Sequence, residues 1–255
     1  MKGSWALITG ASSGFGWALA ELLAQRGVNL ILTARRQDRL EKLKAKITAE
    51  HRVMIETLTF DVRDYAQCET ALKTKASLVA NVSILINNAG LGRGSEPMPT
   101  GKIEDWDQMI DTNIKGLLYI TRLVLPYMIE RNQGHIVNLG SIAGRWVPPG
   151  MGVYSATKYA VRALSEGLRI DLLGTKIRLS NIEPGIAETE FAHVRMGDDE
   201  KATGVYRGIE PLTSHDVAEA IVWCLDRPAH VNIHEMVIMP QAQAGCGAHN
   251  VFRRK

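Results

Sequence analysis

Short apolar runs alternate with amphipathic helical patterns along almost the whole chain, and this alternation limits the possible folds most. Runs typical of buried strands lie at 5–9, 28–33, 54–60, 83–87, 135–139, 177–183 and 233–238. Helical patterns lie between them, near 14–26, 37–50, 64–80, 104–131, 152–173 and 213–227. Parallel strands need long crossover connections, and helices supply them while covering both faces of the sheet. The alternation therefore predicts an α/β fold with a parallel sheet between two layers of helices.

The chain is predicted to form one domain, residues 1–255, because no linker, repeat or low-complexity run divides its 255 residues. Only the stretch 186–211 breaks the alternation, and it is polar, charged and glycine-containing. An insertion after the carboxyl end of a strand is where a doubly wound fold places a substrate lid. An ordinary surface loop is the alternative interpretation.

Composition gives no signal for a macromolecular partner or a metal. The net charge is only +3, and we expect no nucleic-acid partner. No run approaches the roughly 18 apolar residues of a membrane span, so we expect no membrane association. The three cysteines, Cys68, Cys224 and Cys246, show no metal-ligand spacing. We therefore expect no metal site and reduced thiols, as in a cytoplasmic protein.

A glycine-rich turn follows the first predicted strand and opens the first predicted helix. It runs from Thr9 through Gly10, Ser12, Ser13, Gly14, Phe15 and Gly16. Glycines let the backbone approach a pyrophosphate, which the amino end of the helix attracts. The pattern alone is weak, but the strand–turn–helix context predicts a dinucleotide site.

The end of the second strand predicts which dinucleotide binds. A site for NAD usually has a carboxylate there, but this chain has Ala34 followed by Arg35 and Arg36. A guanidinium can hold a 2′-phosphate through two hydrogen bonds, so we predict NADP(H). A solvated basic helix start is the alternative.

Two further strand ends are expected beside the same crevice. Asp61 and Val62 follow the third strand, where Asp61 could accept a hydrogen bond from an adenine amino group. The run 87–90, Asn-Asn-Ala-Gly, ends the fourth strand and is either part of the cofactor site or a plain turn.

Tyr154 and Lys158 are four residues apart, so on a helix they share one face. A nearby ammonium favours the phenolate, and we expect Lys158 to lower the pKa of Tyr154 from about 10 toward working pH. Such a phenol can exchange a proton with an alcohol or carbonyl oxygen. A solvated pair on a helix surface is the alternative, but Ser141 and Asn113 upstream favour a catalytic set.

Together these motifs resemble the short-chain dehydrogenase/reductase family, in the right order and over nearly the whole chain. The resemblance implies a seven-stranded Rossmann-type sheet and a homodimer or homotetramer. It implies that Tyr154 is the general acid/base and that Ser141 binds the carbonyl oxygen. Lys158 would hold the ribose and tune Tyr154, and Asn113 would hold a water in a proton relay. The implied cofactor residues are Gly10, Ser12, Ser13, Gly14, Phe15, Gly16, Arg35, Arg36, Asp61, Val62, Asn88, Ala89, Gly90, Tyr154, Lys158, Pro184, Gly185, Ile186 and Thr189.

Further segments, such as 109–113, 189–191 and 228–233, resemble the NADP-dependent 3-hydroxy acid dehydrogenase branch, which includes sulfoacetaldehyde reductases. The resemblance implies a short aldehyde or alcohol bearing a carboxylate or sulfonate. Members of the branch have an aromatic residue near Pro148, so the exact substrate stays open.

Two arginines are candidates to read that anion. Arg195 lies in the predicted lid, where its alternative is a surface pairing with an acidic residue of 198–200. Arg145 is the second candidate, beside Ser141 and Tyr154 as substrate-binding residues. The rival function for the whole chain is a catalytically silent NADP-binding regulator of the same fold.

Overall fold

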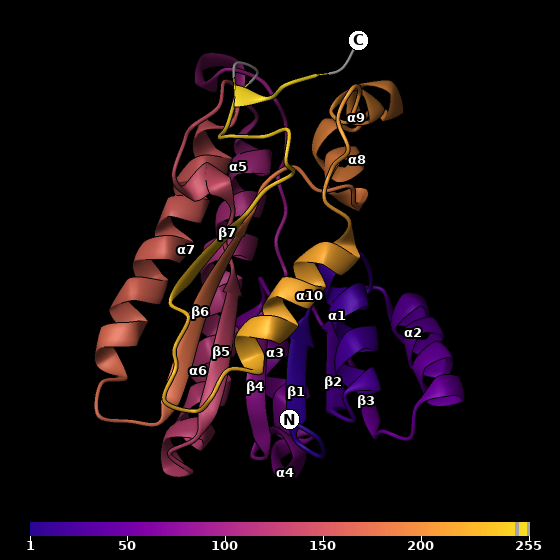
Figure 1. Ribbon diagram of the computed structural model, residues 1–255, viewed down its shortest axis with the longest axis vertical. Helices are drawn as coiled ribbons and strands as arrows, with labels where there is room; N and C mark the ends of the chain where they lie inside the picture. Colours follow the sequence, from indigo (N-terminus) through magenta and orange to yellow (C-terminus); the bar gives the residue numbers. More distant parts are fainter. Residues whose placement is uncertain (248–249, 254–255) are drawn as a thin grey trace.

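The computed structural model describes residues 1–247 and 250–253 (Figure 1). The predicted domain also includes 248–249 and 254–255, which lie outside the described residues. The described chain contains one seven-stranded parallel sheet with the strand order β3-β2-β1-β4-β5-β6-β7. Its strands are β1 (Trp5–Thr9), β2 (Asn29–Ala34), β3 (Ile55–Thr59), β4 (Val82–Asn87), β5 (Gly134–Leu139), β6 (Ile177–Pro184) and β7 (Glu235–Ile238). The α/β fold class and the seven-stranded sheet are confirmed.

Helices cover both faces of this sheet. One face carries α1 (Gly14–Gln25), α2 (Gln37–Glu50) and α10 (Ser214–Leu225). The other carries α3 (Tyr65–Lys73), α4 (Ala76–Val79), α6 (Leu117–Glu130) and the end of α7 (Gly152–Asp171). In Figure 1, α10 lies in front of the sheet and α6 behind it. None of the described helices is long and apolar enough to cross a membrane.

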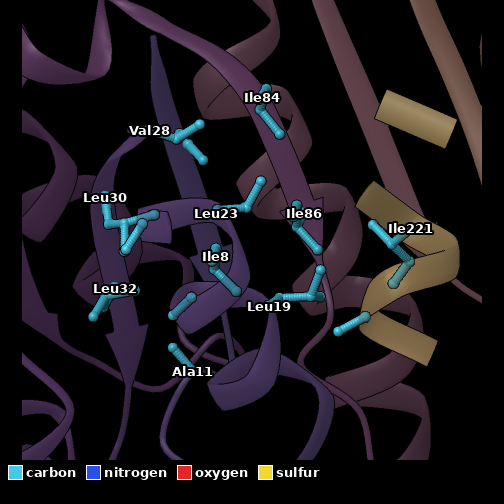
Figure 2. Packing of buried hydrophobic residues seen from close by; sticks show 14 of the residues in the cluster. Ile8, Ala11, Leu19, Leu23, Val28, Leu30, Leu32, Ile84, Ile86 and Ile221 are labelled. Atoms are coloured by element: carbon cyan, nitrogen blue, oxygen red, sulfur yellow. The ribbon is translucent and has the colours of Figure 1, made fainter. Parts of the chain in front are cut away.

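Alternate residues of each strand supply the two cores. Ala6 and Ile8 of β1 pack in the cluster that contains α1 and α10, where Figure 2 shows Ile8 near Leu19 and Leu23. Trp5 and Leu7 point to the opposite cluster, with α3 and α6. Since successive side chains of a strand face opposite sides, a strand buried on both faces reads as a continuous apolar run. This explains why the apolar runs located the strands well.

Two predicted helices are interrupted, so their prediction as single helices was wrong. The predicted helix 64–80 divides into α3 and α4 at residues 74–75. The predicted helix 104–131 contains α5 (Ile103–Ile110), then a π-helical segment η2 (Asp111–Gly116), then α6. Single-turn π segments occur often at functional sites, and this one carries Asn113. Apolar periodicity continues through it, so the change of helix type has no signal in the sequence.

The predicted lid folds into two short helices, α8 (Glu190–Met196) and α9 (Asp199–Gly204). The Thr189 hydroxyl caps the start of α8 by accepting a hydrogen bond from the Phe191 amide. Gly197 ends the helix in the left-handed region, at φ 62°. The carboxyl-terminal segment lies at the same end of the molecule (Figure 1), where Arg253 donates to the carbonyls of Val205 and Arg207.

Candidate active site

The glycine-rich turn between β1 and α1 exposes backbone donors. Gly10 and Gly14 have φ values of +66° and +54°, which favour glycine. At Gly16 a Cβ atom would lie 2.5 Å from the Gly10 carbonyl oxygen, so the helix and the turn could not pack this closely with another residue. Ser13, at the N-cap of α1, makes no side-chain cap. The first amide groups of α1 therefore stay available for a phosphate.

The strand order reverses between β1 and β4, and hydrogen bonds fix the two strand ends there. The Thr9 hydroxyl accepts from the Asn88 and Ala89 amides at 3.0 and 2.9 Å. The Asn88 side chain donates back to the Thr9 and Gly10 carbonyls, at 2.8 and 3.2 Å. This network holds the turn against the loop after β4, so the floor of the crevice is rigid.

A crevice of about 570 Å³ lies over this floor. Every predicted cofactor residue lines it except Gly16, which is buried beneath the turn. Ser141 and Arg195 also line it, whereas Asn113 lies behind its wall. The structure thus brings together residues that are spread over 180 positions of the sequence.

Arg36 lies directly against the glycine-rich turn. Its Nε and Nη2 atoms donate to the Ser12 hydroxyl at 3.2 and 3.1 Å, and Nη2 also donates to the Ser13 hydroxyl at 2.9 Å. Its Nη1 atom donates to Glu190 at 3.0 Å, and Arg39 pairs with the same carboxylate. The sequence analysis missed Arg39 and Glu190. Glu190 and the two arginines are about 150 positions apart, so no local sequence motif indicates their pairing.

Arg35 and Asp61 form the other side of the adenosine end. The Arg35 guanidinium is 4.0 Å from the Asp61 carboxylate and its side chain is 60% exposed. Asp61 is held mainly by Arg63, through bonds of 2.6 to 3.0 Å. Burial raises the pKa of Asp61, but the bonds from Arg63 outweigh it and hold that pKa below its usual value. Asp61 is therefore an ionised acceptor at neutral pH.

Asn113 ties the π segment to the loop after β4. Its Nδ2 atom donates to the Leu91 carbonyl at 2.9 Å and to the Thr157 hydroxyl at 3.0 Å. Its Oδ1 atom accepts from the Leu91 amide at 2.9 Å. The side chain therefore positions this loop against α7, and its role in a water relay stays a prediction.

Tyr154 and Lys158 lie on one face of α7, as their spacing predicts. Both are buried, at 8% and 6% exposure. The Lys158 ammonium is 5.8 Å from the centroid of the Tyr154 ring and donates to the Leu139 carbonyl at 2.7 Å. The Ser141 hydroxyl accepts from the Ala143 amide at 3.1 Å and bonds to Tyr154. A phenol, a hydroxyl and an ammonium thus converge on the crevice.

The expectation that Lys158 lowers the pKa of Tyr154 was wrong for this geometry. Burial raises the pKa of Tyr154 to about 12, although the bond from Ser141 and the charge of Arg195 act in the opposite direction. Burial also lowers the pKa of Lys158 to about 8. The ammonium points at the Leu139 carbonyl and not at the phenol oxygen. Tyr154 is therefore a protonated phenol at neutral pH, ready to donate.

A second cavity, of about 320 Å³, adjoins the crevice. Tyr154, Arg195, Met151 and Pro148 line both spaces, so they form the shared wall. The Arg195 Nε atom donates to the Gly94 carbonyl at 3.1 Å, and no hydrogen bond of its Nη atoms is seen within residues 1–247 and 250–253, although the charge of Glu96 acts on the guanidinium. Burial lowers the pKa of Arg195, but a guanidinium stays charged at any working pH.

The cavity contains two further cationic residues that the sequence analysis missed. Arg93 and Lys102 line it, opposite Glu96 and Asp105. The remaining wall is largely apolar, with Met98, Trp106, Met109 and Val153. Arg93 and Lys102 belong to loops without a recognisable motif, so only the fold could reveal them.

Arg145 does not reach either space, contrary to its expected role in binding substrate. Its guanidinium pairs with Glu183 and Glu235, and it lines neither cavity. Glu183 is only 1% exposed, and burial raises its pKa, so the guanidinium compensates a carboxylate inside the protein. Arg145 therefore links β6 to β7 through these two ion pairs.

The carboxyl-terminal segment also contributes to the crevice, which the sequence did not indicate. The Gln243 side chain accepts from the Ile186 amide at 2.8 Å and so fixes the loop after β6. Cys246 packs in the cluster around Tyr154 and Leu91. Burial raises the pKa of this thiol to about 11, so it is neutral.

Comparison with known proteins agrees with this geometry. The family model of the short chain dehydrogenases matches residues 4–200. The chain is 47% identical to the NADP-dependent 3-hydroxy acid dehydrogenase YdfG of Escherichia coli strain K12, over 97% of this chain and 99% of that protein. It is 45% identical to sulfoacetaldehyde reductase 2 of Chromohalobacter salexigens, over 93% of this chain and 94% of that protein.

A solved structure is similar over the same length. The closed form of serine dehydrogenase complexed with NADP+ superposes with a TM-score of 0.89 and is 46% identical. The match covers 98% of this chain and 100% of that one. The two folds therefore agree over nearly the whole length of both chains.

Proposed function

The chain belongs to the short-chain dehydrogenase/reductase family, and we propose that it interconverts a short anionic aldehyde and its alcohol. It is an NADP-dependent oxidoreductase that acts on CH–OH groups. Two substrate pairs fit the proposal. One is malonic semialdehyde and its 3-hydroxy acid, and the other is sulfoacetaldehyde and isethionate.

The position of Arg195 carries this proposal. Its side chain lines the cavity that Tyr154 also lines, and burial raises the pKa of the Tyr154 phenol while the nearby positive charge of Arg195 acts in the opposite direction. An anion held by Arg195 would therefore lie a short distance from the proton donor. A reactive carbonyl two or three atoms from the anion would reach the phenol.

The residues of the crevice fit NADP(H). The α1 amides and the glycine-rich turn would hold the pyrophosphate, and Arg35 and Arg36 with Ser12 and Ser13 would hold the 2′-phosphate. When bound, the cofactor supplies the hydride. The residues of the chain would bind and orient the cofactor and the substrate, and would protonate the substrate oxygen.

Tyr154 would give its proton to the substrate oxygen during reduction. Its raised pKa keeps the phenol protonated at neutral pH, which suits a general acid. The Ser141 hydroxyl, at the start of the η3 turn (Ile142–Gly144), would donate a hydrogen bond to the same oxygen as negative charge develops there. Tyr154 is buried and Ser141 is half-buried, so water competes poorly with them for the substrate oxygen.

Lys158 would supply the replacement proton, and Asn113 would hold a water beside it. The Asn113 Oδ1 and Lys158 Nζ atoms both lie close to Gly90, within 3.5 Å of where its Cβ would be. With a pKa of about 8, the ammonium can release and regain a proton near neutral pH. We propose that these two groups connect Tyr154 to solvent.

The anionic group could be a carboxylate or a sulfonate. One relative is named for 3-hydroxy acids and another for sulfoacetaldehyde, so these names support both. A planar carboxylate matches one guanidinium edge. The nearby charges of Arg93 and Lys102 would suit a sulfonate as well.

A substrate panel tests the proposal. NADPH oxidation is followed with malonic semialdehyde, sulfoacetaldehyde and succinic semialdehyde, and with propanal and butanal as neutral aldehydes of similar size. We expect at least about tenfold higher kcat/KM for the best anionic aldehyde, because a charge-assisted hydrogen bond contributes roughly 1.5–3 kcal/mol. Equal values for anionic and neutral aldehydes would refute anion recognition. No NADPH oxidation with any aldehyde would favour the silent regulator.

A further inference from the structure

Glu190, the first residue of lid helix α8, connects the lid to two arginines of α2. Its carboxylate accepts from Arg36 Nη1 at 3.0 Å and also pairs with Arg39. Burial raises the pKa of Glu190, but the bonds from Arg39 and Arg36 outweigh it and hold that pKa below its usual value. The carboxylate is thus ionised at neutral pH and bridges two cations.

Arg36 belongs at the same time to the proposed 2′-phosphate site. Its other two nitrogens donate to the Ser12 and Ser13 hydroxyls of the glycine-rich turn. Arg35, Arg36 and Glu190 all line the crevice. Two guanidiniums, those of Arg36 and Arg39, face one carboxylate of the lid, and Arg35 lines the same crevice, so the positive excess suits a phosphate dianion. Asp61, 4.0 Å from Arg35, is itself neutralised by Arg63.

The other end of α8 is hydrogen-bonded to residues 93–94, which line the second cavity, the proposed substrate site. The Gly94 amide donates to the Arg195 carbonyl at 3.0 Å, and Arg195 Nε donates to the Gly94 carbonyl at 3.1 Å. Arg93 donates to the Val194 carbonyl at 3.0 Å. A helix of seven residues is only about 10 Å long, so α8 is a short rigid link between Glu190 and Arg195.

We propose that Glu190 is a positioning residue that couples the 2′-phosphate of the cofactor to closure of the lid over the substrate anion. The inference rests on the proposed function, because it requires the 2′-phosphate at Arg36 and the substrate anion at Arg195. A phosphate fixes the arginine side chains in advance, so docking of Glu190 then costs less conformational entropy. NADPH therefore prepares the substrate site better than NADH does, beyond its own tighter binding.

Hydrogen exchange of the α8 amides tests the coupling without turnover. The parent, Glu190→Gln and Glu188→Gln are each saturated with adenosine 2′,5′-bisphosphate or with adenosine 5′-monophosphate. Glu188 is exposed and forms no side-chain hydrogen bond or ion pair among the described residues, its charge acting only on the nearby Tyr206 phenol, so it controls for the charge lost from this loop.

In the parent and in Glu188→Gln, we expect the bisphosphate to slow exchange of residues 190–196 about two- to fivefold more than the monophosphate. This range follows from the small free energies of partly exposed ion pairs. In Glu190→Gln the two nucleotides should protect α8 equally. Arg39→Met, which leaves Arg36 and the serines untouched, should lose part of the difference.

A kinetic comparison gives a second readout. In the parent, KM for the aldehyde should be lower with saturating NADPH than with saturating NADH. Glu190→Gln should shrink this difference, whereas Glu188→Gln should keep it.

The outcomes separate the coupling from the cofactor assignment. If the parent binds the bisphosphate no more tightly than the monophosphate, the 2′-phosphate site itself is misplaced, and the coupling falls with it. If the parent prefers the bisphosphate but Glu190→Gln keeps the full difference in α8 protection, only the coupling is overturned.

Discussion

The cofactor crevice and the second cavity, where we propose that the substrate binds, meet at Tyr154, but they are built in different ways. In the crevice, backbone geometry dominates: glycines at positive φ shape the turn, and the Thr9 hydroxyl fixes the two strand ends. In the cavity, side chains from separate loops meet, among them Arg93, Lys102 and Arg195. The first region is set by the sheet, whereas the second depends on how three loops and a lid dock.

The difference shows where specificity is determined. A dinucleotide presents the same pyrophosphate in every reaction, so a rigid backbone cradle suits it. Substrates differ, and loops around a fixed scaffold can change without harm to the fold. Tyr154, the proposed proton donor, lines both regions, as a group that must face cofactor and substrate together would.

Tyr154→Phe tests whether the shared wall carries the chemistry, and it should have the largest effect. The phenyl ring keeps the contact with Phe191, whose ring centroid is 5.4 Å away, and loses only the proton. We expect kcat to fall about 10²–10⁴-fold with little change in NADPH affinity. Steady-state kinetics and a fluorescence titration measure the two quantities. A variant with near-parent kcat would show that Tyr154 is not the acid.

Gly16→Ala and Gly92→Ala compare the two regions directly. At Gly16 a Cβ would meet backbone atoms, 2.5 Å from the Gly10 oxygen, whereas at Gly92 it would meet the Phe191 ring of the lid, 2.7 Å from Cζ. Because the lid can yield and the turn cannot, Gly16→Ala should cost about 1–3 kcal/mol of stability and weaken NADPH binding.

Gly92→Ala should cost less than about 1 kcal/mol and raise mainly the KM for the aldehyde. Urea unfolding and cofactor titration of both variants measure the contrast. Equal losses in both would mean that the lid side is as rigid as the turn.

Lys158→Met tests a stability cost in the cofactor region. Below about pH 8 the Lys158 ammonium is charged in both the folded and the unfolded protein, and its burial lowers the free energy of unfolding. Between about pH 8 and the ordinary lysine pKa of 10.5 the unfolded chain binds the extra proton, so the parent gains stability as pH rises. The full cost is on the order of 3 kcal/mol, reduced in the variant by the unpaired Leu139 carbonyl.

We therefore expect Lys158→Met to be more stable than the parent at pH 7, by about 1–2 kcal/mol. This advantage should shrink by pH 9.5. Urea unfolding at both pH values measures it. A variant that is less stable at pH 7 would show that the ammonium is stabilised where it lies.

The sequence predicted the cofactor region better than the substrate region for a physical reason. The glycine-rich turn, the two arginines after β2 and the strand ends each form a contiguous motif. Parallel strands then bring their carboxyl ends to one edge of the sheet. Arg39 and Glu190 were not predicted, because Glu190 pairs with Arg36 and Arg39, which lie far from it in the sequence.

Side-chain direction was the main source of error. Arg145 is the second candidate for binding the anion in the sequence, but the buried carboxylate of Glu183 holds it. The tyrosine pKa was misjudged because four residues on a helix fix a shared face and not the direction of the lysine ammonium. The homodimer or homotetramer stays a prediction.

The central claim is that Arg195 reads the anion of the substrate, and one ratio tests it most directly. The measurement is kcat/KM for the best anionic aldehyde divided by that for butanal, in the parent, Arg195→Met and Arg207→Met. Arg207 is an exposed arginine of the same lid stretch that lines neither cavity, so it is the matched control. We expect Arg195→Met to lower the ratio by roughly 10²-fold and Arg207→Met to leave it unchanged. Equal losses for anionic aldehyde and butanal in Arg195→Met would contradict the account, because Arg195 would then shape the lid without reading the anion.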